Sequence, residues 1–142
     1  MARVLIIGCG CRGQQLAREL AGAGLAVRGT TRDPARTGAI AAAGAEPYVG
    51  DPDRIGTLMG ALGGVTIVCW LLGTVPDPDL HGPRLRMLFE KLVDTPVRGV
   101  VYETALAAGE RIARDAAQRW QIPVAIVQPG GARAAVDRLL GL

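Results

Sequence analysis

The feature that most constrains the fold of this chain is a glycine-rich hexapeptide near its amino terminus. Residues 8–13 read G-C-G-C-R-G, follow the apolar run V-L-I-I at 4–7, and lead into a segment in which Leu16 and Leu20 stand four residues apart. That spacing places both leucines on one face of a helix. The chain is therefore predicted to begin with a strand, a tight glycine turn and an amphipathic helix that packs on a sheet.

Each glycine of this turn has its own expected role. Gly8 permits the tight turn, Gly10 lets a ligand approach the backbone, and Gly13 lets the helix pack closely on the strand. The start of the helix, at Cys11 and Arg12, offers free backbone amides and a partial positive charge to phosphate groups. The ligand predicted for this loop is the pyrophosphate of a dinucleotide.

Strand-like and helix-like segments alternate along all 142 residues. Strands are predicted at 4–7, 26–30, 46–49, 66–72, 97–102 and 124–128, with helices near 12–23, 35–43, 53–62, 80–93, 106–120 and 133–140. The strand cores are apolar on both faces, as is typical of parallel strands covered by helices on two sides. We therefore predict an α/β fold: one doubly wound parallel sheet of the Rossmann type, in a single domain over 1–142.

Composition argues against several other classes of protein. Hydrophobic residues make up 49% of the chain and charged residues 20%, which is the range of a globular protein. The basic residues are scattered and aromatics are only 4%, which argues against nucleic acid as a partner. No apolar run reaches the length of a membrane span, and the three cysteines form no disulfide or metal framework. We expect a cytoplasmic protein, with Cys11 serving as a small residue beside the nucleotide rather than as a reactive thiol.

The residues after the second predicted strand bear on the choice of cofactor. An acid at this point binds the 2′-hydroxyl of NAD, whereas an arginine accommodates the 2′-phosphate of NADP. Thr31 and Arg32 can both donate to phosphate, and Arg12 supplies a second positive charge. Asp33 lies where an NAD-binding acid is expected, but it precedes Pro34 and is better explained as a helix cap. NADP is therefore the predicted cofactor, with NAD as the second choice.

Together these motifs resemble those of the atypical and extended short-chain dehydrogenase/reductases, especially the NmrA-like and epimerase/dehydratase-like proteins. The resemblance extends over nearly the whole chain and includes G-D at 50–51, L-L-G at 71–73 and Q-P-G at 128–130. It implies that Asp51 contacts the adenine and that Leu71, Leu72 and Gly73 line the adenosine and ribose. From the residues alone, Asp51 can equally cap the helix that follows it.

The catalytic motif of that family is missing from this sequence. Its enzymes pair a tyrosine with a lysine in Tyr-x-x-x-Lys, together with Ser or Thr, to move a proton during hydride transfer. This chain contains one lysine, Lys91, which lies before Tyr102, and Leu106 stands four residues after that tyrosine.

Other residues at the end of the fifth predicted strand are candidates for catalysis. Glu103 is a candidate base, and Tyr102 or Thr104 a candidate proton donor; the alternative is a strand-end cluster that contacts the following helix. His81, the only histidine, is expected near the surface at the start of a helix. Trp70 is expected to be a packing residue.

Three functions remain open from the sequence. The first is an NADP-dependent oxidoreductase or epimerase, and the second is a regulator that senses NADP(H) and signals to a protein partner without turnover. In the third, another chain supplies the substrate site, because the sequence ends at Leu142 before the family's usual substrate segment. Under that third reading, a helix face left uncovered is expected to self-associate into a homo-oligomer.

Overall fold

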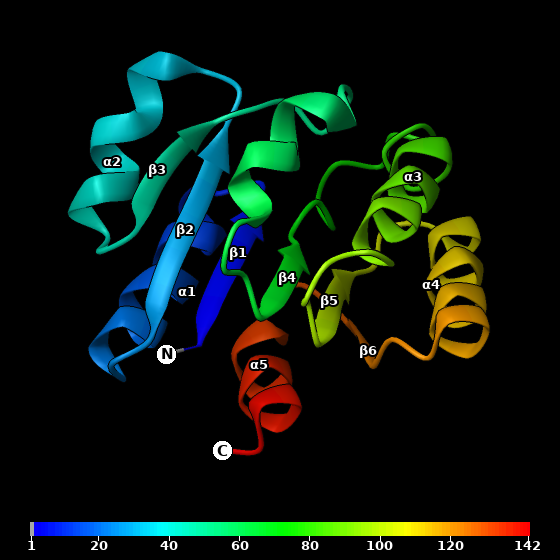
Figure 1. The fold of residues 1–142 in the computed structure, drawn as a ribbon. Helices are drawn as coiled ribbons and strands as arrows, with labels where there is room; N and C mark the ends of the chain where they lie inside the picture. The colour runs from blue at the N-terminus through cyan, green and yellow to red at the C-terminus, as the bar shows by residue number, and fades with distance from the viewer. Residues whose placement is uncertain (1) are drawn as a thin grey trace.

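A six-stranded parallel sheet forms the centre of the computed structural model, which describes residues 2–142. The strand order is β3-β2-β1-β4-β5-β6, and each neighbouring pair is parallel (Figure 1). The strands are β1 (Arg3–Ile7), β2 (Ala26–Thr31), β3 (Glu46–Val49), β4 (Ile67–Trp70), β5 (Gly99–Glu103) and β6 (Val124–Val127). The predicted doubly wound Rossmann architecture is therefore confirmed.

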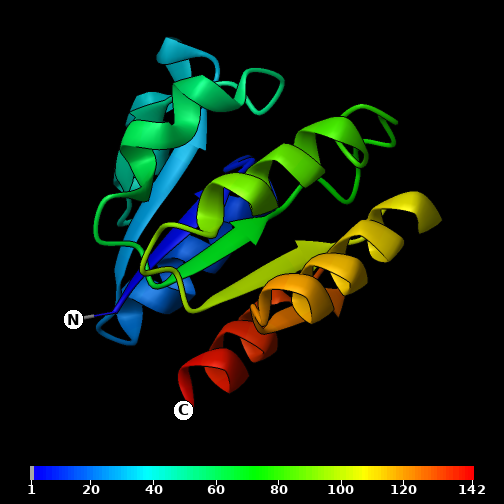
Figure 2. The same ribbon diagram turned by 45° about the vertical axis from the view of Figure 1, so that its right-hand side comes forward.

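Helices cover both faces of this sheet and create two apolar cores. One face packs against α1 (Cys11–Gly22), α2 (Thr37–Ala42) and α5 (Ala132–Leu140). The other packs against the 3₁₀ segment η2 (Ile55–Leu62), α3 (Pro83–Leu92) and α4 (Ala107–Trp120). Figure 2 shows α3 and α4 lying side by side in front of the sheet.

Strand β4 shows why the central strands are apolar throughout. Val68 and Trp70 face one core while Ile67 and Cys69 face the other, because successive side chains point to opposite sides of a strand. All four are completely buried. A polar residue at any of these positions would lose its hydration without gaining a partner.

Several elements differ from their predicted form. The segment predicted as a helix over 53–62 is the 3₁₀ segment η2, which contains Gly56 and Gly60, residues of low helix propensity. The helix predicted over 35–43 is divided into the 3₁₀ turn η1 (Pro34–Arg36) and α2. The helix predicted from residue 80 begins at Pro83, where proline's missing N–H costs nothing.

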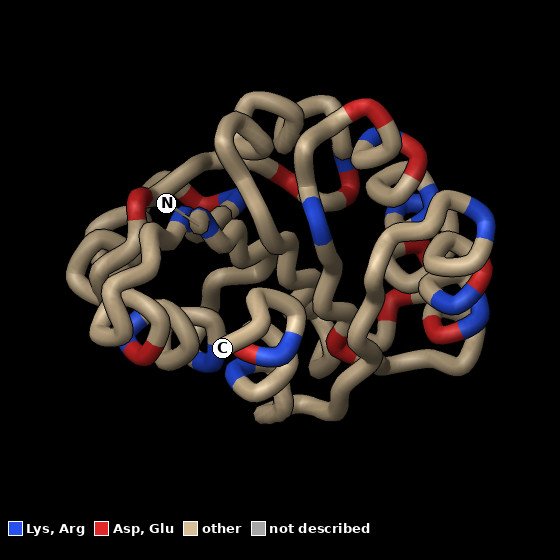
Figure 3. The backbone as a smooth tube through the Cα atoms, turned by 60° about the horizontal axis from the view of Figure 1, so that its bottom comes forward, with Lys and Arg blue, Asp and Glu red and all other residues tan. Residues whose placement is uncertain are grey.

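Lys and Arg positions are interspersed with Asp and Glu positions along much of the backbone (Figure 3). On α4, for example, Arg114 lies 3.7 Å from Glu110 and Arg119 lies 3.4 Å from Asp115, both at i, i+4 spacing. Such exposed pairs contribute little to stability. No helix within residues 2–142 has the length and apolar character needed to cross a membrane.

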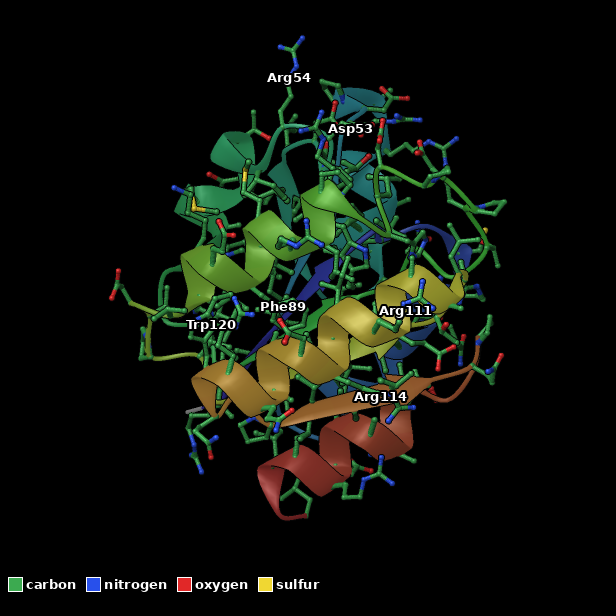
Figure 4. All side chains as sticks on the ribbon, turned by 90° about the vertical axis from the view of Figure 1, so that its right-hand side faces the viewer. Asp53, Arg54, Phe89, Arg111, Arg114 and Trp120 are labelled. Carbon is green, nitrogen blue, oxygen red and sulfur yellow. The ribbon has the colours of Figure 1, made fainter. Side chains whose placement is uncertain are left out.

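Truncation of Phe89 should test the packing between α3 and α4, where Figure 4 shows this side chain. Phe89 is fully buried, so Phe89→Ala should lower the free energy of unfolding by about 3–5 kcal/mol. Met87 on the same helix is 38% exposed, and Met87→Ala should change the free energy of unfolding by less than about 1 kcal/mol. Urea unfolding of both variants measures the difference, and equal losses would contradict the described packing.

Candidate functional site

The glycine loop lies at the carboxyl end of β1, the strand that pairs with both β2 and β4. Gly8 has a φ of +89°, and a Cβ added there would lie 2.8 Å from the carbonyl oxygen of Leu71. A Cβ at Gly13 would lie 3.0 Å from the carbonyl oxygen of Gly8. A Cβ at Gly10, by contrast, would meet nothing within 4 Å. Packing of the protein itself therefore explains Gly8 and Gly13, whereas the space at Gly10 is free.

A cavity of about 680 Å³ opens above this loop, a volume typical of small-molecule sites. It lies between β1 and β4, where the order of the strands reverses. Of the residues predicted to bind cofactor, those that line it are Gly8, Gly10, Cys11, Arg12, Gly13, Thr31, Arg32, Leu71 and Leu72. Among the described residues, Asp51 and Gly73 stand outside this lining, although their neighbours Gly50 and Thr74 belong to it.

The segment after β2 contributes two exposed arginines to the cavity: Arg32 directly follows the strand and Arg36 ends η1. Asp33 accepts a hydrogen bond from the Ala35 N–H at 3.0 Å and caps η1, as predicted. The Thr31 hydroxyl accepts one from the Asp33 N–H at 3.1 Å. Sequence reasoning did not select Arg36, although its position four residues after Arg32 was a signal that the two lie near each other.

Asp51 makes local contacts in the turn after β3. One carboxylate oxygen accepts from the Asp53 N–H at 2.9 Å, and its own N–H donates to the Thr57 hydroxyl at 2.8 Å. These bonds fix the turn that leads into η2. Asp51 does not cap η2, because that segment begins after Arg54 and has no side-chain cap bond; contact of Asp51 with an adenine stays a prediction.

At the end of β5, Glu103 joins three segments of the chain. Its side chain is 1% exposed, and its carboxylate accepts from the Gly73 N–H at 2.7 Å and forms an ion pair with Arg12. Arg12 also donates to the Thr74 hydroxyl at 3.4 Å. The arginine that was expected to face phosphate is thus already paired with a carboxylate, and the candidate base is already satisfied.

Tyr102 belongs to a second buried network with His81. The tyrosine hydroxyl lies 2.6 Å from Nδ1 of His81, while Nε2 lies 3.0 Å from the Leu72 oxygen and 2.8 Å from the Val75 oxygen. Because carbonyls only accept, Nε2 carries the proton and Nδ1 accepts from the tyrosine. Burial raises the pKa of Tyr102, which keeps the phenol protonated.

The prediction that His81 lies near the surface is wrong. Its side chain is fully buried, and it ties the loop after β4 to β5. A single histidine after a loop rich in proline and aspartate carries no periodic signal that would have revealed this. Thr104, the third candidate, donates to Glu110 of α4 at 2.9 Å. This is the contact with the following helix that was expected as the alternative to a catalytic role.

The three cysteines occupy different environments. Cys9 and Cys69 are buried, whereas Cys11 is exposed in the cavity wall. Burial raises the pKa of the Cys9 thiol to about 11 and also raises that of Cys69. Within residues 2–142, no three His, Cys, Asp or Glu side chains are grouped so that they could hold a metal ion.

Fold and cavity together define a Rossmann domain with a cleft at its switch point. No family model matches the sequence, and no curated protein matches it. Solved structures do match the fold, and the chain spans about half the length of those described below.

Three of these structures illustrate the likeness. A conserved protein of unknown function from Silicibacter pomeroyi is 28% identical, with a TM-score of 0.60 over 90% of this chain and 53% of its own. A short-chain dehydrogenase/reductase superfamily protein from Agrobacterium tumefaciens, with bound NAD, is 19% identical, with a TM-score of 0.73 over 89% and 48%. The triphenylmethane reductase of Citrobacter sp., complexed with NADP(H), is 18% identical, with a TM-score of 0.71 over 89% and 48%.

Burial of Cys9 should make the protein less stable in alkali. The folded state holds the thiol proton to about pH 11, whereas the unfolded state releases it near pH 9.0. The unfolded state therefore binds fewer protons in that range, and the free energy of unfolding should fall as pH rises, by up to about 3 kcal/mol for this group.

Urea unfolding under reducing conditions across that range measures the loss. Cys9→Ala should show a smaller fall than the wild type, because one buried thiol has been removed. Cys11→Ala removes an exposed thiol and is the matched control. A fall of equal size in all three proteins would show that Cys9 is not its source.

Proposed function

We propose that this protein binds NADP(H) in the cavity at the carboxyl ends of β1, β2 and β4. The observation that carries the proposal is the free space at Gly10, directly before the first residue of α1 and open to the cavity. A helix start with unhindered backbone amides is suited to a diphosphate. The glycine loop and the start of α1 would hold the pyrophosphate, and the bound nicotinamide would supply hydride chemistry.

Two features support NADP(H) over NAD(H). Arg32 and Arg36 are both exposed in the cavity wall beyond β2, where a ribose 2′-phosphate would lie. Asp33, the acid that could bind a 2′-hydroxyl, instead accepts from the Ala35 N–H and lies 3.8 Å from Arg36. The compared structures hold NAD in one case and NADP(H) in another, so this fold accepts both and local residues decide between them.

A second candidate function is a sensor that binds NADP(H) without turnover. It is favoured by the state of the candidate catalytic residues, since Tyr102 is bonded to His81 and Glu103 to Arg12 and Gly73. A base whose oxygens are already occupied is poorly placed to take a substrate proton. The oxidoreductase or epimerase alternative would require these bonds to rearrange.

Arg32→Ala should weaken NADPH binding selectively. Loss of a charged hydrogen bond to the 2′-phosphate should raise the Kd for NADPH about tenfold or more, and that for NADH by less than about twofold. Calorimetric titration with both nucleotides measures these constants.

Arg54 provides a matched control for this variant. It is an exposed arginine of the same region that extends away from the protein, as Figure 4 shows, and it stands outside the cavity lining. Arg54→Ala should leave both constants near their wild-type values. Failure of the wild-type protein to bind either nucleotide would refute the proposed function.

Gly10→Ala should separate binding from folding. Since a Cβ there meets no protein atom, the free energy of unfolding should change by less than about 1 kcal/mol. The same methyl group would keep a pyrophosphate from the backbone, so the Kd for NADPH should rise by about tenfold or more. Unchanged affinity in a normally folded variant would show that the phosphates do not lie over this glycine.

A further inference from the structure

The ion pair between Arg12 and Glu103 spans the crevice at the switch point. Arg12 belongs to the glycine loop after β1, and Glu103 ends β5, which lies beyond β4 in the sheet. The arginine side chain is 36% exposed, whereas that of Glu103 is buried. The pair therefore connects the first half of the fold with β5 of the second half.

Close packing fixes Glu103 in this position. A Cβ added at Gly73 would collide with Cγ of Glu103, so the side chain passes directly over the glycine backbone. The Gly73 N–H donates to one carboxylate oxygen at 2.7 Å, and Arg12 pairs with the other. Both oxygens thus have a partner, as a buried carboxylate requires.

The cavity reaches only one side of this pair. Its walls come from the glycine loop, the ends of β2 and β3, and the loop after β4. In the part of the chain that the structure describes, the lining extends no further than Leu80, and β5 and β6 contribute nothing to it. Arg12 faces the cavity, while Glu103 lies behind it.

A dinucleotide in a doubly wound sheet lies across the switch point, with one nucleotide over each half. The open cavity lies over the ends of β1, β2 and β3 and is bounded on its other side by the loop after β4. We propose that Glu103 determines which ligands bind this site: an adenosine phosphate binds with the Arg12–Glu103 pair closed, whereas a full dinucleotide binds only when the pair parts. This inference rests on the proposed nucleotide-binding function.

Charge explains why parting the pair opposes binding. Arg12 can exchange the carboxylate for a ligand phosphate, because a guanidinium bonds to either anion. Glu103 would then remain as a buried negative charge, with only the Gly73 N–H as its partner, beside the ligand's phosphates. If only a fraction of the molecules has the pair open, the apparent affinity for the dinucleotide is reduced by that fraction.

Glu103→Gln tests this inference, with adenosine 2′,5′-bisphosphate and NADPH as the two ligands. Glutamine keeps the size of the side chain and an oxygen for the Gly73 N–H, but loses the attraction to Arg12. The Kd for NADPH should fall by about tenfold, while that for the bisphosphate should fall by less than about threefold. Calorimetric titration of each protein with each ligand gives the ratio of the two constants.

Asp77→Asn is the matched control for loss of charge. Asp77 also lines the cavity, and its Oδ1 accepts from the Asp79 N–H at 2.9 Å, a bond that asparagine can keep. This variant removes a negative charge without touching the Arg12–Glu103 pair. It should change the Kd values for NADPH and for the bisphosphate by similar factors, and so leave their ratio near that of the wild type.

The outcomes separate this inference from the function on which it rests. Equal tightening of both ligands by Glu103→Gln, or weaker NADPH binding, would overturn the role given to Glu103 while leaving the nucleotide site intact. Binding of neither ligand to any of the proteins would refute the site itself. If Glu103→Gln does not fold, Glu103→Ala, which removes the same charge and leaves Arg12 free to bind phosphate, should show the same change in the ratio.

Discussion

The pairing of β1 with both β2 and β4 determines where the rest of this protein lies. Parallel neighbours must be joined by crossovers, and right-handed crossovers from β1 to β2 and from β3 to β4 place helices on opposite faces of the sheet. The chain therefore leaves β1 and β4 in different directions, and a cleft opens between their carboxyl ends. The glycine loop lies at this cleft because it is the first turn after the central strand.

Local rules predicted the parts of the site that depend on neighbours in the chain. The turn at Gly8, the cap at Asp33 and the alternation of strands and helices all follow from short-range chemistry. The pair between Arg12 and Glu103 joins residues 91 positions apart. The residues next to each of them in the sequence showed no sign that the two would meet. The burial of His81 was missed for the same reason, since its partner Tyr102 is distant in the chain.

The loop between β4 and α3 is held from two sides. His81 donates to carbonyls at both ends of its first turn, and Glu103 accepts from Gly73 within it. Gly109 at the start of α4 makes room for this arrangement, because a Cβ there would collide with the Tyr102 hydroxyl. Buried polar groups with all partners in place favour a single conformation of this loop.

The burial of Cys9 also restricts how this sequence can evolve. Its sulfur lies against the places where Cβ atoms would stand at Gly13 and Gly29, at 3.4 and 2.7 Å. One thiol thus fills volume shared by the first helix and the second strand. In descendants of this chain, a larger residue at position 29 would have to be accompanied by a smaller one at position 9, so the two positions should change together.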